Sequence, residues 1–242
     1  TRTLGCDAKR ITVVPVGAEE SQFHPDGNVT ATDGVHVGAN LNSSSNPNSN
    51  RTSEVLFFGT FIGLQGAIHI AQAVAHYQGP FCKLTFLGDG PERRRCEQLI
   101  AQISNELVSV EFEEWVDYEQ LAARIRRADL CLGVFGTGDK TSRVIPNKVY
   151  QSLACAVPVL TCSAQAYPSL LQSGSNVATA GITFVPAGDA RAIASGIEDF
   201  FRGTIQQRQR QAAAAYALYQ QNFSNARIEQ TLAQLLAQLQ PS

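Results

Sequence analysis

Methionine is absent from the 242-residue chain, tryptophan occurs once, and only 17% of the residues are charged. No apolar run approaches the roughly 18 residues that a membrane-spanning helix needs, and no signal-peptide pattern opens the chain. The 19 basic and 21 acidic residues leave a net charge of −2. This argues against a nucleic-acid clamp, which needs a basic face to neutralise phosphates. Because a sequence without methionine does not include a translation start, we expect this chain to be part of a longer protein.

The apolar content of 44% excludes a disordered chain, and the length suits one large domain or two small ones. The six cysteines are not spaced as metal ligands, and Cys82, Cys131 and Cys155 lie in apolar segments where a thiol behaves as a small hydrophobe. We therefore expect reduced, buried cysteines in a cytoplasmic protein, with peripheral contact at the inner membrane face still allowed. No Asp-x-Asp pair occurs, so the sequence does not support a bridging divalent metal, and we expect no other cofactor.

Composition divides the chain into three segments. Residues 1–25 contain a strand-like apolar run, Ile11–Val16, and a turn-rich exit. Residues 26–53 are rich in Gly, Asn, Ser and Thr and have almost no large apolar side chain. Burial cannot offset the ordering entropy of such a segment, so we interpret it as a flexible polar insertion. Residues 54–242 have the regular pattern of a folded domain.

Short apolar runs alternate with helical patterns throughout this third segment. The runs expected to form strands are Val55–Gly59, Lys83–Leu87, Leu107–Phe112, Leu130–Phe135, Val157–Thr161 and Ile182–Val185. Runs of this length, rich in Val, Ile, Leu and Phe, indicate strands of a parallel sheet that is covered on both faces. The sequence therefore predicts an α/β fold with a doubly wound, mostly parallel, Rossmann-like sheet and C-terminal helices.

Helix signals separate these runs. Pro91 suits the first turn of a helix, and Asp117 with Gln120 three residues later forms a capping-box-like pair. A further helix is predicted for Pro146–Ala154, and the chain is expected to be helical after Gly188. Packing against the domain is favoured over a partner site for the apolar stripe of the last helix. That stripe consists of Ile228, Leu232, Leu235, Leu236 and Leu239.

Ligands of doubly wound domains lie outside the carboxyl ends of the strands, where the strand order reverses. In the commonest topology this point lies between the first and fourth strands, so the loops of interest are Gly59–Gly66, Gly88–Pro91 and Gly133–Lys148. The Gly88–Pro91 turn is either an anion site at a helix start or a tight turn with an aspartate cap. A dinucleotide fingerprint would need glycine where Arg93 stands, so an NAD-dependent oxidoreductase is disfavoured.

The Gly133–Lys148 loop is the richest in charge. Its candidate binding residues are Asp139, Lys140, Arg143, Asn147 and Lys148. Three cations beside a helix start form a plausible cradle for a diphosphate, because each of these elements stabilises negative charge. The alternative is a solvated loop whose cations pair with surface carboxylates. The position at the predicted switch point favours binding.

The order of motifs along the chain resembles a known family. The motifs are Gly59-Thr60, Leu64-Gln65-Gly66, Gly88-Asp89-Gly90-Pro91, Asp129–Gly136, Asp139-Lys140, Arg143–Gln151 and Ala154–Val159. Together they resemble the C-terminal, nucleotide-sugar-binding half of family-four retaining glycosyltransferases, which have the GT-B fold. The resemblance runs from about Ile11 to the end of the chain, interrupted by the insertion, and residues 1–25 then correspond to the crossover from a missing N-terminal domain.

This resemblance implies the transfer of a sugar from a nucleoside diphosphate donor to an unknown acceptor, with retention of configuration. The chain would supply the donor-binding half, and the N-terminal half would lie in the same polypeptide or in another one. It implies no metal and leaves the catalytic residues unknown. The alternative is a non-catalytic nucleotide-sugar-binding subunit that works with a separate acceptor-binding chain.

Residues carried over from the family give the expected donor site. Many relatives have basic residues where Thr60 and Gln65 stand and two glutamates where Arg143 and Gln151 stand. We therefore expect a rearranged site in which Lys148 and Arg143 bind the diphosphate, Gln151 the ribose, and the Asp139-Lys140 loop the sugar. The complete expected site consists of Gly59, Thr60, Gln65, Gly66, Gly88, Gly90, Asp139, Lys140, Arg143, Asn147, Lys148 and Gln151.

Overall fold

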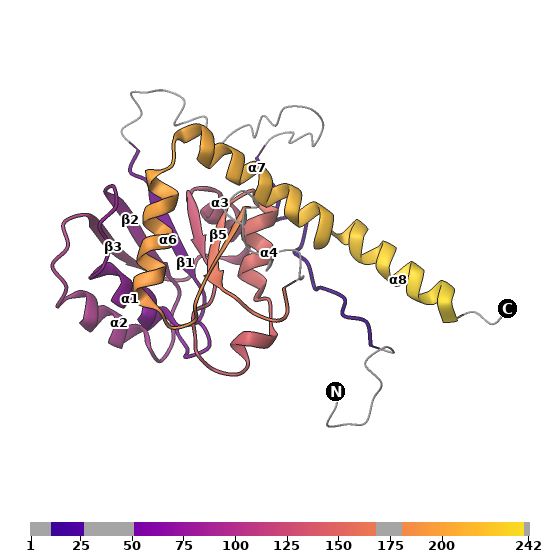
Figure 1. The fold of residues 1–242 in the computed structure, drawn as a ribbon, viewed down its shortest axis with the longest axis horizontal. Coiled ribbons are helices and arrows are strands. Elements are labelled where there is room, and N and C mark those ends of the chain that lie inside the picture. Colours follow the sequence, from indigo (N-terminus) through magenta and orange to yellow (C-terminus); the bar gives the residue numbers. More distant parts are fainter. Residues whose placement is uncertain (1–10, 27–50, 168–180, 240–242) are drawn as a thin grey trace.

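The structure is a computed structural model that describes residues 11–26, 51–167 and 181–239 (Figure 1). The predicted polar insertion, apart from its two ends, lies outside these residues, as do Cys6 and the side chain of Leu239. Cys82, Cys96, Cys131, Cys155 and Cys162 are buried and unpaired, as the sequence predicts for those five. No helix within the described ranges is long and apolar enough to cross a membrane.

Six strands form one parallel sheet in the order β3-β2-β1-β4-β5-β6. The strands are β1 (Glu54–Phe58), β2 (Cys82–Leu87), β3 (Val108–Glu113), β4 (Leu130–Leu132), β5 (Val159–Cys162) and β6 (Ile182–Val185). In the register of β1, Leu56 lies opposite Thr85 on one side and Cys131 on the other. The predicted sheet is confirmed, and the strand order reverses between β1 and β4, where the sequence placed the crevice.

Helices cover both faces of the sheet (Figure 1). They are α1 (Ala67–Val74), α2 (Arg93–Ile100), α3 (Tyr118–Arg126), the short 3-10 helix η3 (Thr141–Arg143), α4 (Asn147–Ala154), α6 (Ala190–Arg202), α7 (Ile205–Asn222) and α8 (Asn225–Leu239). One apolar cluster joins α1, α2 and α6 to the sheet, and the other joins α3, α4 and α7. Alternation along β1 divides its side chains between the two clusters. Val55 and Phe57 enter the first, and Leu56 and Phe58 enter the second.

The apolar run Ile11–Val16 is not a strand, contrary to the prediction, because residues 11–19 have no regular secondary structure. A strand-like sequence becomes a strand only when a neighbouring strand accepts its hydrogen bonds. This segment instead lies beside the C-terminal end of α7, where the N–H of Ala18 donates to the Tyr219 hydroxyl at 3.1 Å. Val13 and Val16 are exposed.

The capping pair predicted at Asp117 is also wrong in its detail. Asp117 occupies the N-cap of α3, but its side chain makes no capping hydrogen bond. A complete capping box lies elsewhere, at the start of α7, where Thr204 and Gln207 bond reciprocally. The right two residue types make a capping box possible, but the box forms only when both side chains adopt rotamers that reach the backbone N–H groups.

Helix α8 extends away from the domain (Figure 1). The side chains of Leu232 and Leu236 in its apolar stripe are 45% and 64% exposed. The expectation that this stripe packs against the domain is therefore wrong for these two leucines. Most of this helix projects beyond the edge of the helix–sheet–helix body, and within the described part of the chain these two leucines remain exposed.

Candidate functional site

The loops that follow β1, β2 and β4 meet at the carboxyl edge of the sheet with their backbones in close contact. A Cβ atom on Gly88 (φ 123°) would overlap the carbonyl oxygen of Gly59, and a Cβ atom on Gly66 (φ 68°) would lie 2.5 Å from the amide nitrogen of Gly136. Larger residues at Gly88 or Gly66 would therefore both strain the backbone and push two loops apart. Glycine at these positions allows the three predicted loops to meet at the switch point of the sheet, and the place where they meet is called the crevice below.

Lys148 enters this crevice from the first turn of α4. The residue is 6% exposed, and a Cβ atom on Gly59 would lie 2.8 Å from its Nζ. The Nζ atom also lies 3.9 Å from the ring centroid of Phe57 and 5.7 Å from that of Phe58. Side chains tilt toward the N-terminus of their helix, which explains why a lysine in the first turn of α4 reaches the end of β1. The structure thus brings together the predicted residues Gly59 and Lys148.

The ammonium group of Lys148 has an unusual electrostatic environment. Its Nζ atom has no hydrogen-bond partner within the described part of the chain. Burial lowers the pKa of Lys148 from its usual 10.5 to about 7. The aromatic face of Phe57 compensates in part, because a ring attracts a cation by about 1–2 kcal/mol when both are desolvated. A buried cation without a counter-charge is costly, so the site favours the arrival of an anion.

Gln65 faces the same glycine. Its Oε1 atom would lie 3.5 Å from a Cβ atom on Gly59, and it too is buried without a hydrogen-bond partner among the described residues. One donor group and one acceptor group, both unsatisfied, therefore flank a single glycine. Buried polar groups are normally paired, so an unpaired set of this kind is expected where a polar ligand completes the bonding.

The second predicted cation lies differently. Arg143, in η3, has a 64% exposed side chain and forms an ion pair with Asp139. Lys140 and Asn147 are exposed as well. Arg143 thus has the arrangement of the alternative interpretation, in which a loop cation pairs with a surface carboxylate, whereas Lys148 is turned inward. Sequence spacing could not separate the two, because their directions depend on a three-residue helix and the turn after it.

Gln151 lies one turn after Lys148 on α4, so the two side chains share a helix face. Gln151 is half-buried and lies near Tyr118, whose hydroxyl donates to Glu19 Oε2 at 3.3 Å. Partial burial and the neighbouring Glu19 carboxylate raise the pKa of the Tyr118 hydroxyl, and Gln151 opposes the rise. The remaining predicted residues Thr60 and Gly90 lie in the loops after β1 and β2, with Thr60 exposed.

Two residues that the sequence did not assign to the site border the Gly88 turn. A Cβ atom on Gly88 would lie 3.0–3.1 Å from the indole atoms Cζ2 and Cη2 of Trp115, a residue that is 49% exposed. Arg93 donates from Nη1 to the carbonyl oxygen of Gly88 at 2.7 Å and pairs with Glu114 at 3.0 Å. The signal for Trp115 was its position directly after β3 as the one tryptophan of the chain.

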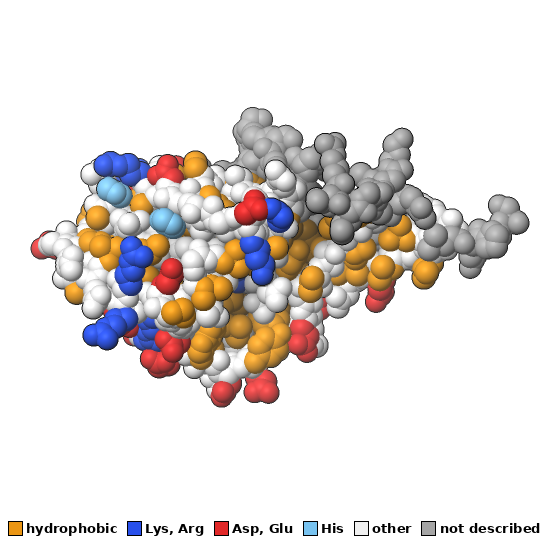
Figure 2. All heavy atoms as spheres, turned by 90° about the horizontal axis from the view of Figure 1, so that it is seen from below, with side chains coloured by type: hydrophobic (Ala, Val, Ile, Leu, Met, Phe, Trp, Pro, Cys, Tyr) orange, Lys and Arg blue, Asp and Glu red, His pale blue; other side chains and the backbone are white. Residues whose placement is uncertain are grey.

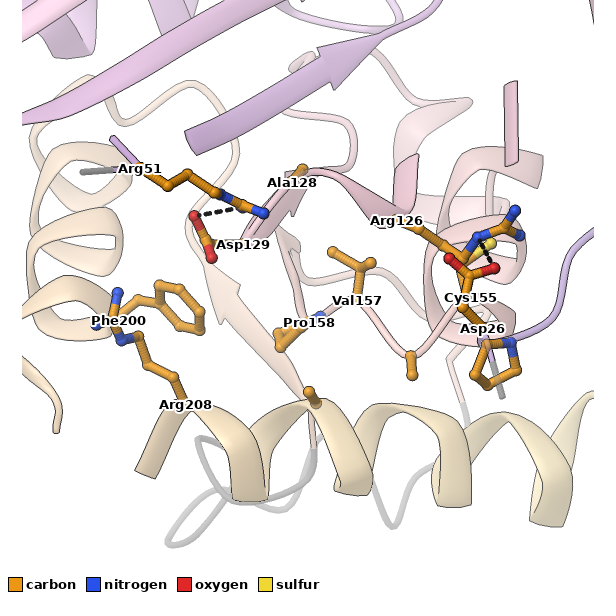
Figure 3. A pocket seen from close by; sticks show the side chains of 13 residues that line it. Asp26, Arg51, Arg126, Ala128, Asp129, Cys155, Val157, Pro158, Phe200 and Arg208 are labelled. Atoms are coloured by element: carbon orange, nitrogen blue, oxygen red, sulfur yellow. Dashed lines mark ion pairs between the residues drawn. The ribbon is translucent and has the colours of Figure 1, made fainter. Parts of the chain in front are cut away.

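A second cavity, of about 40 Å³, lies at the opposite, amino edge of the sheet (Figure 3). Arg51 pairs with Asp129 at 3.1 Å toward one end of this cavity, and Arg126 pairs with Asp26 at 2.8 Å toward the other. These charges neutralise one another across the amino ends of the strands, where doubly wound domains do not place their ligands. The carboxyl-edge crevice is therefore the candidate site.

Basic and acidic side chains are interspersed with hydrophobic ones on the face seen from below the view of Figure 1 (Figure 2). No single sign of charge dominates it, as expected from the net charge of −2. Among the described residues, no group of three or more His, Cys, Asp and Glu side chains is arranged to hold a metal ion.

Comparisons with known proteins agree with this geometry. The model of the family described as "Glycosyl transferases group 1" matches residues 52–202. No curated protein sequence matches the chain. The structure is similar to that of Anabaena HepE in complex with UDP, with a TM-score of 0.70 and 17% identity over 98% of this chain and 60% of that chain. Sucrose-phosphate synthase from Thermosynechococcus elongatus is similar with a TM-score of 0.65 and 21% identity, over 94% of this chain and 52% of that chain.

A third similar structure is the C-terminal domain of the group 1 glycosyl transferase LpcC from Francisella tularensis. Its TM-score is 0.63 and its identity 15%, over 86% of this chain and 100% of that domain. The chain thus spans about 60% of the length of HepE but matches an isolated C-terminal domain throughout. These likenesses show the fold, which is one Rossmann-like half of the GT-B fold. Because the family model covers more than half of the sequence, the chain belongs to the group 1 glycosyl transferases, family four of the glycosyltransferases.

Proposed function

We propose that this chain is the donor-binding half of a retaining hexosyltransferase that takes its sugar from a nucleoside diphosphate. One observation carries the proposal, namely that Lys148 and Gln65, both buried and unpaired among the described residues, face Gly59 at the switch point of the sheet. A diphosphate placed there would supply the missing counter-charge for the ammonium and accept its hydrogen bonds.

The roles of the neighbouring residues follow from their positions. Lys148 would bind the diphosphate at the bottom of the crevice. Arg143 would also bind the diphosphate only if it broke its ion pair with Asp139 and paired with a phosphate group instead, which its exposed position allows. Gln151, one turn further along α4, would bond to the ribose without charge assistance. Trp115 offers a flat apolar face beside Gly88 on which a base could stack.

A uridine nucleotide is the donor class to test first. The similar HepE structures contain UDP, UDP with glucose, and UDP-glucose. The present crevice has the three loops such a ligand needs and an aromatic ring at its rim. We propose UDP-glucose or a related hexose donor for this chain as well.

The acceptor would be bound by the other half of the enzyme, in the same polypeptide or in a second one. The exposed leucines of α8 and the exposed Val13 and Val16 offer apolar surface to that half. We therefore expect the 242-residue chain to bind the donor and to transfer little sugar by itself.

The binding of UDP tests this function directly. Trp115 is the one tryptophan of the chain, so its fluorescence should change when a base stacks on it. Lys148→Met and Arg143→Met should each weaken binding, with about 1.5–3 kcal/mol for a lost hydrogen bond to a charged group. Lys83→Met is the matched control, because Lys83 lies near the amino end of β2 and pairs with Glu111. Equal UDP affinity in the parent and both crevice variants would contradict the diphosphate cradle.

A further inference from the structure

The surroundings of Lys148 come from three elements. The aromatic rings of Phe57 and Phe58 in β1 lie against its Nζ, and Gly59 with Gln65 closes the space above it. From β4, the side chain of Cys131 interacts with Lys148, and burial raises the pKa of that thiol to about 12. A thiol of this kind is uncharged at neutral pH and does not neutralise an ammonium group.

Carboxylates near this region are engaged elsewhere. Glu54, at the start of β1, is bonded to Arg124 at 2.8 Å and to Thr85 at 2.6 Å. No carboxylate of the described residues forms an ion pair with Lys148. The electrostatic surroundings of the amine in the free protein are thus aromatic rings, an amide oxygen and a neutral thiol. Low polarity of this kind favours the uncharged amine.

A diphosphate reverses this preference. It brings at least two negative charges within reach of Nζ, and an opposite charge within about 4–6 Å favours the charged form of a titratable group. We propose, on the basis of the proposed function, that Lys148 is a neutral amine in the free protein above neutral pH and takes one proton from solvent when the diphosphate binds. Donor binding is then coupled to proton uptake.

This coupling also makes Lys148 a specificity residue. The amine of Lys148 takes up the proton only when the bound ligand places negative charge at the bottom of the crevice. Binding of UDP should therefore be accompanied by proton uptake, and binding of uridine should not. An arginine would stay charged in both states and could not respond in this way. Above neutral pH the affinity for UDP therefore falls by up to about tenfold per pH unit, while the affinity for uridine stays constant.

Two measurements on the 242-residue chain test the proposal. The chain contains four lysines, so isotope labelling of the lysine side chains gives few NMR signals to resolve. In the free protein, the Lys148 signal should report deprotonation near neutral pH, and UDP should move that transition upward by at least about two pH units. Calorimetry of UDP binding at about pH 8, in buffers of different ionisation enthalpy, should show close to one proton taken up per bound UDP.

Matched comparisons separate the possible outcomes. Uridine bound by the parent, and UDP bound by Lys148→Met, should show no proton uptake, whereas UDP bound by Lys83→Met should show the parental uptake. A Lys148 signal that stays in the ammonium form to about pH 9 in the free protein would overturn the proposal. UDP binding without proton uptake at pH 8 would overturn it as well. If UDP does not bind the parent at all, the proposed function fails, and the NMR titration still decides the state of Lys148.

Discussion

Arg93 holds the Gly88–Pro91 turn in place, because its Nη1 donates a hydrogen bond of 2.7 Å to the carbonyl oxygen of Gly88. The same guanidinium pairs with Glu97 at 2.9 Å and Glu114 at 3.0 Å, so it links α2 to the loop after β3. The side chain at this position therefore supports the backbone that a ligand would contact. It occupies the place where a dinucleotide fingerprint would require a glycine.

Replacing Arg93 by methionine should loosen this turn. We expect the free energy of unfolding to fall by about 1–3 kcal/mol, because a buried carbonyl loses a charged donor, and UDP affinity to fall several-fold. Urea unfolding and the fluorescence of Trp115 measure the two effects. The exposed neighbour Arg94→Met serves as the control and should behave like the parent. Parental UDP affinity in Arg93→Met would show that the Gly88 turn does not contact the ligand.

Gly88 should tolerate no side chain. In Gly88→Ala, the new methyl group overlaps the carbonyl oxygen of Gly59 and the φ of 123° becomes strained. We expect a loss of about 2–4 kcal/mol of stability and of most UDP binding. Gly138→Ala is the matched control, because a Cβ atom there meets nothing within 4 Å. Comparable stability of the two variants in urea unfolding would mean that the loops after β1 and β2 are not in contact at Gly59 and Gly88.

Lys148 should make stability depend on pH. Its pKa in the folded state, about 7, lies below its usual 10.5, so the unfolded chain binds more protons between these values. The free energy of unfolding should therefore rise with pH in this window, by at most about 1.4 kcal/mol per unit, as the folded protein sheds a costly charge.

Lys148→Met removes this contribution. Relative to the variant, the parent should gain stability from about pH 7 to about pH 9, as measured by urea unfolding at several pH values. Lys83→Met is the control for the loss of a partly exposed lysine away from the crevice. A constant difference between the parent and Lys148→Met would show that Lys148 keeps one charge state in this range.

A buried and an exposed ion pair should differ in their contribution to stability. Arg124 is 6% exposed and bonds to Glu54 at 2.8 Å and to Glu113 at 2.9 Å, whereas the pair of Arg143 and Asp139 is exposed. Arg124→Met leaves Glu54 without its main partner and should cost about 3–5 kcal/mol. Arg143→Met should cost less than about 1 kcal/mol in the same unfolding experiment. Equal losses would mean that Glu54 finds another partner.

Acid should weaken the same cluster. Burial alone would raise the pKa of Glu54, but the hydrogen bonds from Arg124 and Thr85 outweigh it and lower the pKa below 4.5. A lowered carboxyl pKa contributes stability that is present above the usual value and is lost as pH falls through the lowered one. Part of the acid sensitivity of the parent should therefore be absent in Arg124→Met, where Glu54 has lost this stabilisation of its charge.

The strands could be predicted because their signals are local and redundant, and the place where their order reverses was taken from the commonest doubly wound topology. Each run of apolar residues is short, ends at a turn and is followed by a helical pattern, and β1 is buried on both faces as its unbroken sequence Glu54–Phe58 suggests. Directions of single side chains could not be predicted in this way. Lys148 and Arg143 are both cations near the start of α4, but only the first points into the crevice.

Two other features could not be predicted from the sequence, because they too depend on contacts between distant parts of the chain. Ile11–Val16 has the composition of a strand, but the partner that would make it one is a matter of tertiary structure. Trp115 lies in the site because the loop after β3 bends over Gly88, and the spacing of residues in the sequence does not predict that bend. Local pattern thus predicted the framework, whereas contacts between distant loops determine which groups face the ligand.

The carboxylate of Glu20 accepts hydrogen bonds from the N–H of Asn225 at 2.8 Å and from the hydroxyl of Tyr219 at 3.1 Å. It thereby ties the segment that precedes the domain to the first residue of α8. With 15 residues at about 1.5 Å each, α8 reaches on the order of 20 Å from this joint. A second domain that bound both residues 11–26 and α8 would therefore hold this domain at a single joint.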